Sequence, residues 1–393
     1  MTAIDDCVLV MIEAIPFDGL MQRHQHLAIE LSKFLPVIYV ESTPSRLKRV
    51  LDGRPFDPQL TEYRRGLKKI GENLQLFKAP PCAPRSSGYL RSIEVTCRRT
   101  ATALRPHLPK GKRVILWIFT PAGGPALGLY DEALSIFDCF DAWGEFPGEE
   151  KYRKSIVESL KKIATGVDIV FATSVELLER LKGFNKTAAL MRNGCDPGHF
   201  RAGGLIPEKS NRLYDPDSLK RPVIGYMGDI APWVNLDHLY TAAERHPEWT
   251  IVLLGTWKRD KPPPPKLSNV YAPGRVSYVE LPYYVRGFDV GTIPFALNEL
   301  TRVVNPLKLY EYFAIGLPVV ATPIPEVAIH ENLLYLAGTE DEFVMLLETA
   351  VREKPDSPVR EKRKKVADEN SWKSRVMDIM SVIETKLKEK TRA

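Results

Sequence analysis

The sequence predicts an α/β protein built from two doubly wound domains, and three observations support this prediction. Short apolar runs of strand length alternate with segments of helical periodicity along most of the chain. The alternation stops near residues 202–221 and then begins again. The length of 393 residues suits two domains that each bury a core of their own.

Seven apolar runs in the first half are predicted to be buried strands of a parallel sheet. They lie at Val8–Met11, Val37–Val40, Leu74–Phe77, Val114–Ile118, Ile136–Asp138, Ile169–Ala172 and Ala188–Met191. Helical spacing of apolar residues predicts helices between them at Gln22–Lys33, Lys151–Ala164 and Val175–Lys182. Together these elements predict an N-terminal domain of residues 1–204.

The second half repeats the alternation after a segment rich in Gly, Pro, Asp and Lys, where we place a linker at residues 205–221. The predicted strands are Val223–Met227, Ile251–Leu254, Val290–Ile293 and Leu317–Ala321, with a helix at Leu236–Arg245. A C-terminal domain of residues 222–370 results. Residues 371–393 are expected to form a helix that crosses back to the N-terminal domain.

The composition argues against several classes of protein. No apolar stretch approaches the roughly 18 residues of a membrane-spanning helix, and a secretory signal is not apparent at the start, so we expect a cytoplasmic protein. Five scattered cysteines without CxxC spacing indicate neither a zinc site nor a disulfide framework. No acidic pair has convincing metal-ligand spacing, and we expect neither a metal nor another cofactor.

Positive charge is concentrated in residues 44–113, which hold 17 Lys and Arg against 5 Asp and Glu. This imbalance indicates an anionic partner for one face, and the inner face of the plasma membrane is the favoured one. Phe56, Tyr63 and Tyr89 are candidate residues for insertion at that interface. A solvated face without a partner is the alternative. No nucleic-acid partner is expected, because no recognition motif accompanies the charge.

The strongest chemical signal is a well-delimited helix at residues 305–316. Asn305 is the expected N-cap, Pro306 the first helical residue, and Gly316 the residue that ends the helix. Lys308 and Glu311 are three residues apart and therefore share one face. A helix N-terminus beside a lysine suits a phosphate, and a carboxylate one turn further along can accept hydrogen bonds from two sugar hydroxyls. An exposed Lys–Glu pair without a ligand is the alternative.

The segment Asn305-Pro-Leu-Lys-Leu-Tyr-Glu-Tyr-Phe-Ala-Ile-Gly316, followed by Leu-Pro-Val-Val-Ala-Thr322, resembles the donor-binding segment of family-4 glycosyltransferases. Within that family it is most similar to enzymes of bacterial cell-surface polysaccharide assembly, including teichuronic-acid-type enzymes. The resemblance implies the GT-B architecture, in which two Rossmann-like domains face each other across a cleft. It also implies that Glu311 binds the donor ribose and that Lys308 binds the diphosphate or the sugar.

Five further segments resemble the same family in the same order. They are Gly19-Leu-Met-Gln-Arg-His-Gln-His-Leu-Ala28, Asp138-Cys-Phe-Asp-Ala-Trp-Gly-Glu-Phe-Pro-Gly148, Met191-Arg-Asn-Gly-Cys-Asp196, Val223-Ile-Gly-Tyr-Met-Gly228, and Glu280-Leu-Pro-Tyr-Tyr284 with Phe288-Asp-Val-Gly-Thr-Ile-Pro294. Under this resemblance Gly228 lets the backbone approach the donor and Tyr284 lies beside the nucleotide base. Close packing of a helix on the strand is the alternative for the glycine.

The chain also departs from the family pattern. Val303 stands where many family-4 enzymes have the first of two glutamates, and Asp229 stands where many have an arginine after the loop glycine. Trp233 is found downstream, where many have a lysine. The residues predicted to bind the donor are therefore Gly228, Tyr284, Arg302, Asn305, Lys308 and Glu311.

Four residues of the first half are candidates for acceptor or phosphate binding. Asp141 follows a predicted strand and is the candidate base in an inverting transfer; in a retaining transfer it would position the acceptor. Trp143 nearby can stack on a sugar ring. Arg23 and His24 open the first predicted helix, where an anion binds favourably. Capping, turn and core roles are the alternatives for all four.

Taken together, these features predict a hexosyltransferase that moves a sugar from a nucleotide-sugar to a polysaccharide or lipid-linked acceptor. We favour a UDP-sugar over a GDP-sugar. Lys308 would stabilise the leaving diphosphate. A nucleotide-sugar epimerase of the same fold is one rival, and a non-catalytic binding protein is the other.

Overall fold

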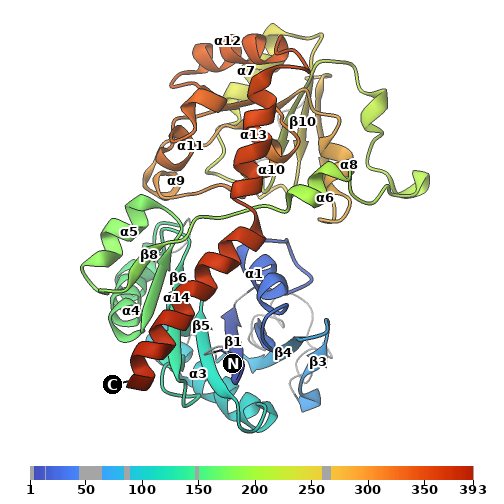
Figure 1. The fold of residues 1–393 in the computed structure, drawn as a ribbon. Coiled ribbons are helices and arrows are strands. Elements are labelled where there is room, and N and C mark those ends of the chain that lie inside the picture. Colours follow the sequence, from blue (N-terminus) through green and yellow to red (C-terminus); the bar gives the residue numbers. More distant parts are fainter. Residues whose placement is uncertain are drawn as a thin grey trace. The chain divides into compact units, whose positions relative to one another are not determined.

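The computed structural model describes residues 4–13, 15–43, 64–83, 89–146, 150–258 and 267–392. The chain divides into two compact units, and each contains one sheet with helices packed on it (Figure 1). The first unit comprises Met1–Arg192 and Arg375–Ala393, and the second comprises Asn193–Ser374. Phe56 and Tyr63, two of the three aromatic residues predicted to meet a membrane, lie outside the described residues.

The first unit contains an eight-stranded sheet with the order β3-β4-β2-β1-β5-β6-β7-β8. Its strands are β1 Cys7–Glu13, β2 Val37–Thr43, β3 Lys68–Lys69, β4 Leu74–Pro81, β5 Arg113–Ile118, β6 Leu134–Cys139, β7 Ile169–Ala172 and β8 Ala188–Leu190. All neighbours pair in parallel except β3 and β4. All seven predicted strands are confirmed. The short edge strand β3 was not predicted, because its two exposed lysines carry no apolar signal.

The helices of the first unit lie between these strands. They are α1 Arg23–Leu31, α3 Tyr89–Leu104, η3 Arg105–His107, η4 Pro121–Ala126, η5 Glu150–Tyr152, α4 Arg153–Gly166 and α5 Val175–Lys182. The three helices predicted here are confirmed, with ends that differ by two residues at most. Because β1 lies between β2 and β5, the strand order reverses at β1 and β5, which is where ligands bind in open parallel sheets.

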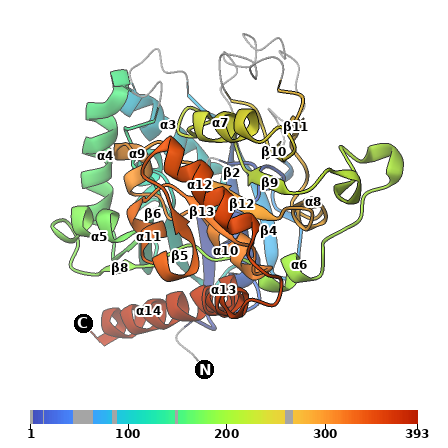
Figure 2. The ribbon, with the colours of Figure 1, turned by 90° about the horizontal axis from the view of Figure 1, so that it is seen from above.

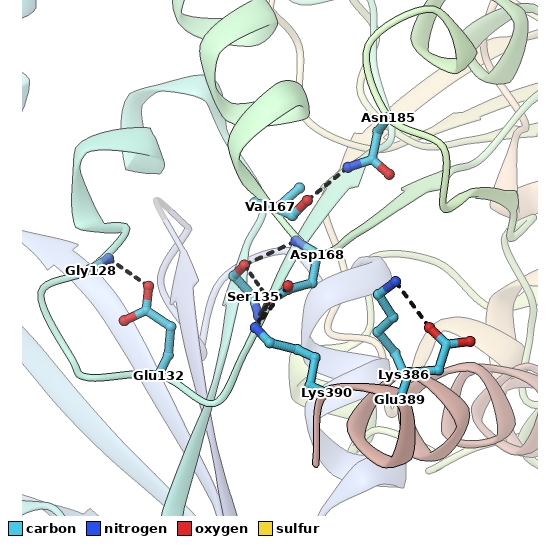
Figure 3. Close-up of polar contacts among 9 residues, drawn as sticks. All are labelled: Gly128, Glu132, Ser135, Val167, Asp168, Asn185, Lys386, Glu389 and Lys390. Atoms are coloured by element: carbon cyan, nitrogen blue, oxygen red, sulfur yellow. Dashed lines mark hydrogen bonds and ion pairs between the residues drawn. The ribbon is translucent and has the colours of Figure 1, made fainter. Parts of the chain in front are cut away.

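The last helix, α14 Trp372–Arg392, completes the first unit. Its side chains Val376, Ile379, Ile383 and Leu387 are buried. Near its end, Lys390 Nζ lies 2.8 Å from Asp168 Oδ1, and the same carboxylate accepts hydrogen bonds from the backbone N–H and hydroxyl of Ser135 (Figure 3). This contact fastens the helix to the start of β6 and the turn before β7.

The second unit contains a six-stranded parallel sheet with the order β11-β10-β9-β12-β13-β14. Its strands are β9 Val223–Met227, β10 Thr250–Leu254, β11 Val270–Gly274, β12 Val290–Ile293, β13 Val319–Ala321 and β14 Tyr335–Leu336. The four predicted strands are confirmed. The two edge strands β11 and β14 were not predicted, since their partly exposed residues form no continuous apolar run.

Helices surround the second sheet, and α7 and α12 pack beside each other against it (Figure 2). The helices are α6 Pro197–Arg201, η6 Lys209–Asn211, η7 Pro216–Ser218, α7 Asp237–Arg245, α8 Leu281–Val285, α9 Glu299–Arg302, α10 Leu307–Ala314, α11 Pro325–Ala328, η8 Glu331–Leu333, α12 Glu340–Val351 and α13 Pro358–Glu369. In the described parts of both units no helix is long and apolar enough to cross a membrane.

The division between the units differs from the predicted one, because residues 193–221 pack on the second unit. Leu205 N–H donates to the carbonyl of Val279 at 2.7 Å, and Leu213 N–H donates to the hydroxyl of Tyr284 at 3.2 Å. The first boundary therefore lies after residue 192, where the sequence predicted it after 204. The second unit ends at Ser374, whereas the sequence predicted that the C-terminal domain would end at residue 370.

Candidate functional site

Helix α10 is almost entirely buried in the second unit. Leu309, Tyr310, Tyr312 and Phe313 are fully buried, so their packing fixes the rotation of the helix about its axis. The helix ends in a Schellman motif at Gly316, which has a φ of +72°. The N–H of this glycine donates to the carbonyl of Phe313, and the next N–H donates to that of Tyr312.

Helix α10 begins one residue later than predicted. Pro306 is the N-cap, with φ −78° and ψ 124°, and the predicted cap Asn305 lies just outside the helix. The Asn305 side chain is engaged elsewhere, since its Nδ2 donates to Tyr310 Oη and to Glu326 Oε2, both at 3.1 Å. Its Oδ1 accepts the N–H of Asn193 at 2.9 Å. Asn305 therefore fastens the Met191–Asp196 segment to the start of α10, and the structure assigns it a positioning role.

Lys308 lies in an aromatic setting on the first turn of α10. Its ammonium is 3.9 Å from the centre of the Tyr226 ring and 5.0 Å from that of Phe295. Among the described residues, no carboxylate pairs with it and no acceptor hydrogen-bonds it. Burial lowers the pKa of Lys308 to about 7, opposed by the nearby charges of Glu311 and Asp229.

Glu311 follows one turn later and is 8% exposed. Burial raises the pKa of its carboxyl to about 7, and the charge of Lys308 opposes that change. In the part of the chain that the structure describes, the Glu311 carboxylate accepts no hydrogen bond and forms no ion pair. An exposed Lys–Glu pair is thus not what the structure shows. Two desolvated charged groups without close partners are costly, and a ligand can supply those partners.

Gly228 closes the other side of this site, directly after β9. It has a φ of +123°, and a Cβ built on it would lie 2.8 Å from Lys308 Nζ. Gly255, directly after β10, packs so closely that its Cβ would lie 1.9 Å from the carbonyl oxygen of Gly228. A side chain at Gly255 would displace the Gly228 backbone, and one at Gly228 would displace the Lys308 ammonium.

These groups gather at the carboxyl end of the second sheet. Strand β9 lies between β10 and β12, so the strand order reverses there. Gly228 follows β9 and Phe295 follows β12, and Lys308 contacts both. Lys308, Glu311 and Gly228 therefore lie where ligands bind in doubly wound sheets.

Two other predicted donor-binding residues form contacts with neighbouring residues. Arg302 is 54% exposed and lies 3.8 Å from Glu299 on its own short helix α9. Tyr284 is buried in α8; its hydroxyl accepts the Leu213 N–H, and its ring packs against Tyr214 with centroids 4.9 Å apart. Val303, at the position of the family's first glutamate, is a fully buried core residue.

In the first unit, Arg23 is buried against Asp138, with Nε 3.0 Å from Oδ2. Burial raises the pKa of Asp138, while the charge of Arg23 and its hydrogen bond act in the opposite direction. The guanidinium also donates to the carbonyl of Arg192 at 3.2 Å. Arg23 thus joins the start of α1 to the end of β6, a role that its position at a helix start did not reveal.

His24 does not fit the predicted role of a charged phosphate contact, because it is uncharged at neutral pH. Its ring lies between those of Phe119 and Phe140, with centroids 5.2 and 5.0 Å away. Burial, and then the charge of Arg23, lower the pKa of His24 to about 3. An imidazole in this state offers no positive charge to a phosphate.

Asp141 and Trp143 lie in the turn that follows β6, at the carboxyl end of the first sheet. Both are half-buried, and the carbonyl of Asp141 accepts the Trp143 N–H at 3.0 Å. The indole packs edge-on against Phe140, with centroids 5.3 Å apart. The Arg23–Asp138 pair lies at the end of the strand that leads into this turn.

The structure also reveals site residues that the sequence did not single out. Tyr226 and Phe295 lie in or next to strands, where an aromatic ring is typical of a core, and only the ammonium above them distinguishes their role. Glu326 has no local pattern that would indicate its buried bond to Asn305. In the described residues no group of three or more His, Cys, Asp or Glu side chains could hold a metal.

Comparison with known proteins bears directly on this site. Residues 221–352, which contain Gly228, Lys308 and Glu311, match the family described as "Glycosyl transferases group 1". The chain is also 26% identical over 296 residues to the putative teichuronic acid biosynthesis glycosyltransferase TuaH of Bacillus subtilis (strain 168), covering 70% of this chain and 73% of that protein. The second unit therefore contains a glycosyltransferase domain of this family, and the chain as a whole is similar to family-4 glycosyltransferases.

Solved structures share the fold of this chain. An E. coli trehalose-6-phosphate structure bound with UDP-2-fluoro glucose has a TM-score of 0.67 at 12% identity, over 96% of this chain and 99% of the other. Anabaena Alr3699/HepE in complex with UDP and glucose has a TM-score of 0.63 at 13% identity, over 95% and 98%. The chain therefore has the GT-B fold, with two Rossmann-like domains.

Proposed function

We propose that this glycosyltransferase moves a hexose from a nucleoside-diphosphate sugar to a polysaccharide or lipid-linked acceptor in cell-surface glycan assembly. The observation that carries the proposal is the desolvated Lys308–Glu311 pair at the carboxyl end of the second sheet. A diphosphate supplies an anion for Lys308, and ribose hydroxyls supply donors for Glu311. A UDP-sugar is favoured over a GDP-sugar, in line with the UDP ligands of two similar folds.

Departure of the nucleoside diphosphate is the step that this site would assist. Negative charge grows on the leaving phosphate as the bond from the anomeric carbon to the phosphate oxygen breaks. Lys308 and the positive end of the α10 dipole can stabilise that charge. The proposal needs no metal or other cofactor.

Acceptor binding is assigned to the turn after β6. In an inverting transfer, Asp141 takes the proton of the attacking hydroxyl, and Trp143 stacks on the acceptor sugar. Arg23 and Asp138 hold this turn in place. Asp141→Asn should lower transfer by about 10²- to 10⁴-fold while donor binding persists. Full transfer activity in that variant would remove Asp141 from the site.

The nucleotide site is tested by thermal unfolding with UDP, GDP, ADP, dTDP and CMP. A nucleotide at about 100 times its dissociation constant adds about 2.7 kcal/mol of stability, and we expect a clear shift with one of the five. Glu311→Ala should abolish the shift. Glu361→Ala is the control, since Glu361 forms an exposed pair with Lys364 at the same three-residue spacing.

Two results would contradict the proposal: no shift with any nucleotide, or a full shift in Glu311→Ala. Once a nucleotide is identified, product analysis with the matching nucleotide-sugar separates the rival epimerase. That enzyme would isomerise its sugar in the absence of an acceptor.

A further inference from the structure

The backbone after β9 departs from the family pattern at Asp229, which brings a negative charge to the candidate phosphate site. This carboxylate is 14% exposed and acts electrostatically on Lys308. Together with Glu311 it places two carboxylates against the single ammonium of Lys308. The Asp229 charge weakens the attraction of this site for a diphosphate, and another cation nearby would offset it.

Lys258, in the segment that follows β10, provides that cation. Its Nζ lies 2.6 Å from Asp229 Oδ2. The backbone of the segment after β10 is fastened to the segment after β9, because Lys258 N–H donates to the carbonyl of Ile230 and Ile230 N–H donates to that of Thr256, both at 2.9 Å. The position of Lys258 is thus fixed by the backbone, although its side chain is 53% exposed.

Lys308 and Lys258 approach two consecutive residues, since Lys308 lies beside Gly228 and Lys258 pairs with Asp229. The Tyr226 side chain contacts both places. Its ring faces the Lys308 ammonium, and its hydroxyl donates to the carbonyl of Asp229 at 2.8 Å. Gly228 carries no side chain that would cover this backbone. The result is two ammonium groups near the turn at the carboxyl end of β9.

We propose that Lys258 is a second diphosphate-binding residue of the donor site, held by Asp229 in the free protein and transferred to a phosphate oxygen when the donor binds. The inference rests on the proposed function. The Lys258 side chain is half exposed, so its ammonium can exchange a carboxylate for a more highly charged diphosphate. Lys258 takes the place that the sequence assigned to Arg302, which lies beside Glu299 instead.

The first test is calorimetric titration of the full chain with UDP, GDP and uridine. Lys258→Met should weaken binding of the preferred diphosphate by about 10-fold, the loss of roughly one charged hydrogen bond, and leave uridine binding unchanged. The matched control is Lys182→Met, because Lys182 is 52% exposed and pairs with Glu179 on a surface helix of the first unit. Equal diphosphate affinity in Lys258→Met and Lys182→Met would overturn the inference.

A second set of variants separates phosphate binding from mere neutralisation of Asp229. If Lys258 only neutralises that carboxylate, the double variant Lys258→Met/Asp229→Asn should bind the diphosphate as tightly as Asp229→Asn does. If Lys258 contacts the phosphate, the double variant should remain about 10-fold weaker than Asp229→Asn. The first result would overturn the inference, and the second would support it.

The same titrations distinguish failure of this inference from failure of the proposed function. Wild-type protein that binds neither UDP nor GDP would overturn both. A second outcome would overturn only the role of Lys258. In that outcome the wild type binds one of the two diphosphates, Lys308→Met abolishes the binding, and Lys258→Met leaves it unchanged.

Discussion

Lys308 and Glu311 are shifted in opposite directions by the same burial. Burial disfavours the charged form of each group, so the pKa of the lysine falls to about 7 and that of the glutamate rises to about 7. The charges that face Lys308 are those of Glu311, on its own helix, and Asp229, after β9. Small changes of pH near neutrality therefore alter the charge of this site.

This arrangement predicts that donor affinity has a maximum near pH 7. Above that pH Lys308 loses the proton that attracts the diphosphate, and below it Glu311 gains a proton and accepts ribose hydroxyls poorly. The measurement is UDP-glucose affinity from pH 5.5 to 8.5, a range in which its diphosphate does not titrate. In Glu311→Gln the donor affinity should no longer fall below pH 7, but it should still fall above pH 7. An affinity independent of pH would contradict this prediction.

The sequence predicted some residues of the site and missed others for physical reasons. Lys308 and Glu311 are predictable because their spacing and the helix ends are local signals. Asn305 has the composition of an N-cap, but its side chain meets Asn193, more than a hundred residues earlier in the chain. Lys258 is 50 residues from Lys308 in sequence, and only the pairing of segments after β9 and β10 brings it to the site.

At the scale of elements, the stability of α10 depends on the residue that ends its last turn. Gly316 adopts a left-handed conformation there, and a Cβ on it would lie 3.1 Å from Lys364 Cε and 3.2 Å from the Arg360 carbonyl oxygen of α13. The glycine thus ends α10 and lets α13 pack closely on it. Its position was predictable from sequence, whereas its contact with α13 was not.

Gly316→Ala should lower the stability of the second unit by about 1–2 kcal/mol, the cost of a left-handed non-glycine residue. Gly183→Ala is the control, since Gly183 has a φ of −67° at the end of α5 and nothing within 4 Å of its added Cβ. That control should be neutral or slightly stabilising. Urea denaturation of both variants is the measurement, and equal unfolding midpoints would contradict the prediction.

At the scale of the whole molecule, charge is distributed unevenly, and part of the basic excess lies on α3. The exposed residues Leu90 and Val95, 40% and 38% accessible, lie beside exposed Arg91, Arg98 and Arg99 on this helix. Exposed Glu94 lies among them and pairs with Arg98 at 3.0 Å, so the net charge of this surface is positive. Apolar and cationic side chains suit the surface of an anionic bilayer. We propose that this face brings the enzyme to a lipid-linked acceptor.

The protein should therefore sediment with vesicles that contain anionic lipid at low salt and be released at high salt. Arg91→Glu/Arg98→Glu should weaken that binding, since each basic residue near such a surface contributes about 1 kcal/mol. Lys362→Glu/Lys365→Glu on α13 changes the net charge equally and serves as the control. No sedimentation at low salt, or equal losses in both double variants, would contradict the prediction.

The first unit is closed by a helix that the sequence encodes last. Residues 375–392 bury apolar side chains in that unit and end at the Asp168–Lys390 contact, after the entire second unit has intervened. On a ribosome adding about 5–20 residues per second, the apolar surface that receives this helix remains uncovered for on the order of ten seconds or more. During that interval it is open to chaperones and to aggregation. The second unit, continuous in sequence, can finish folding before the first.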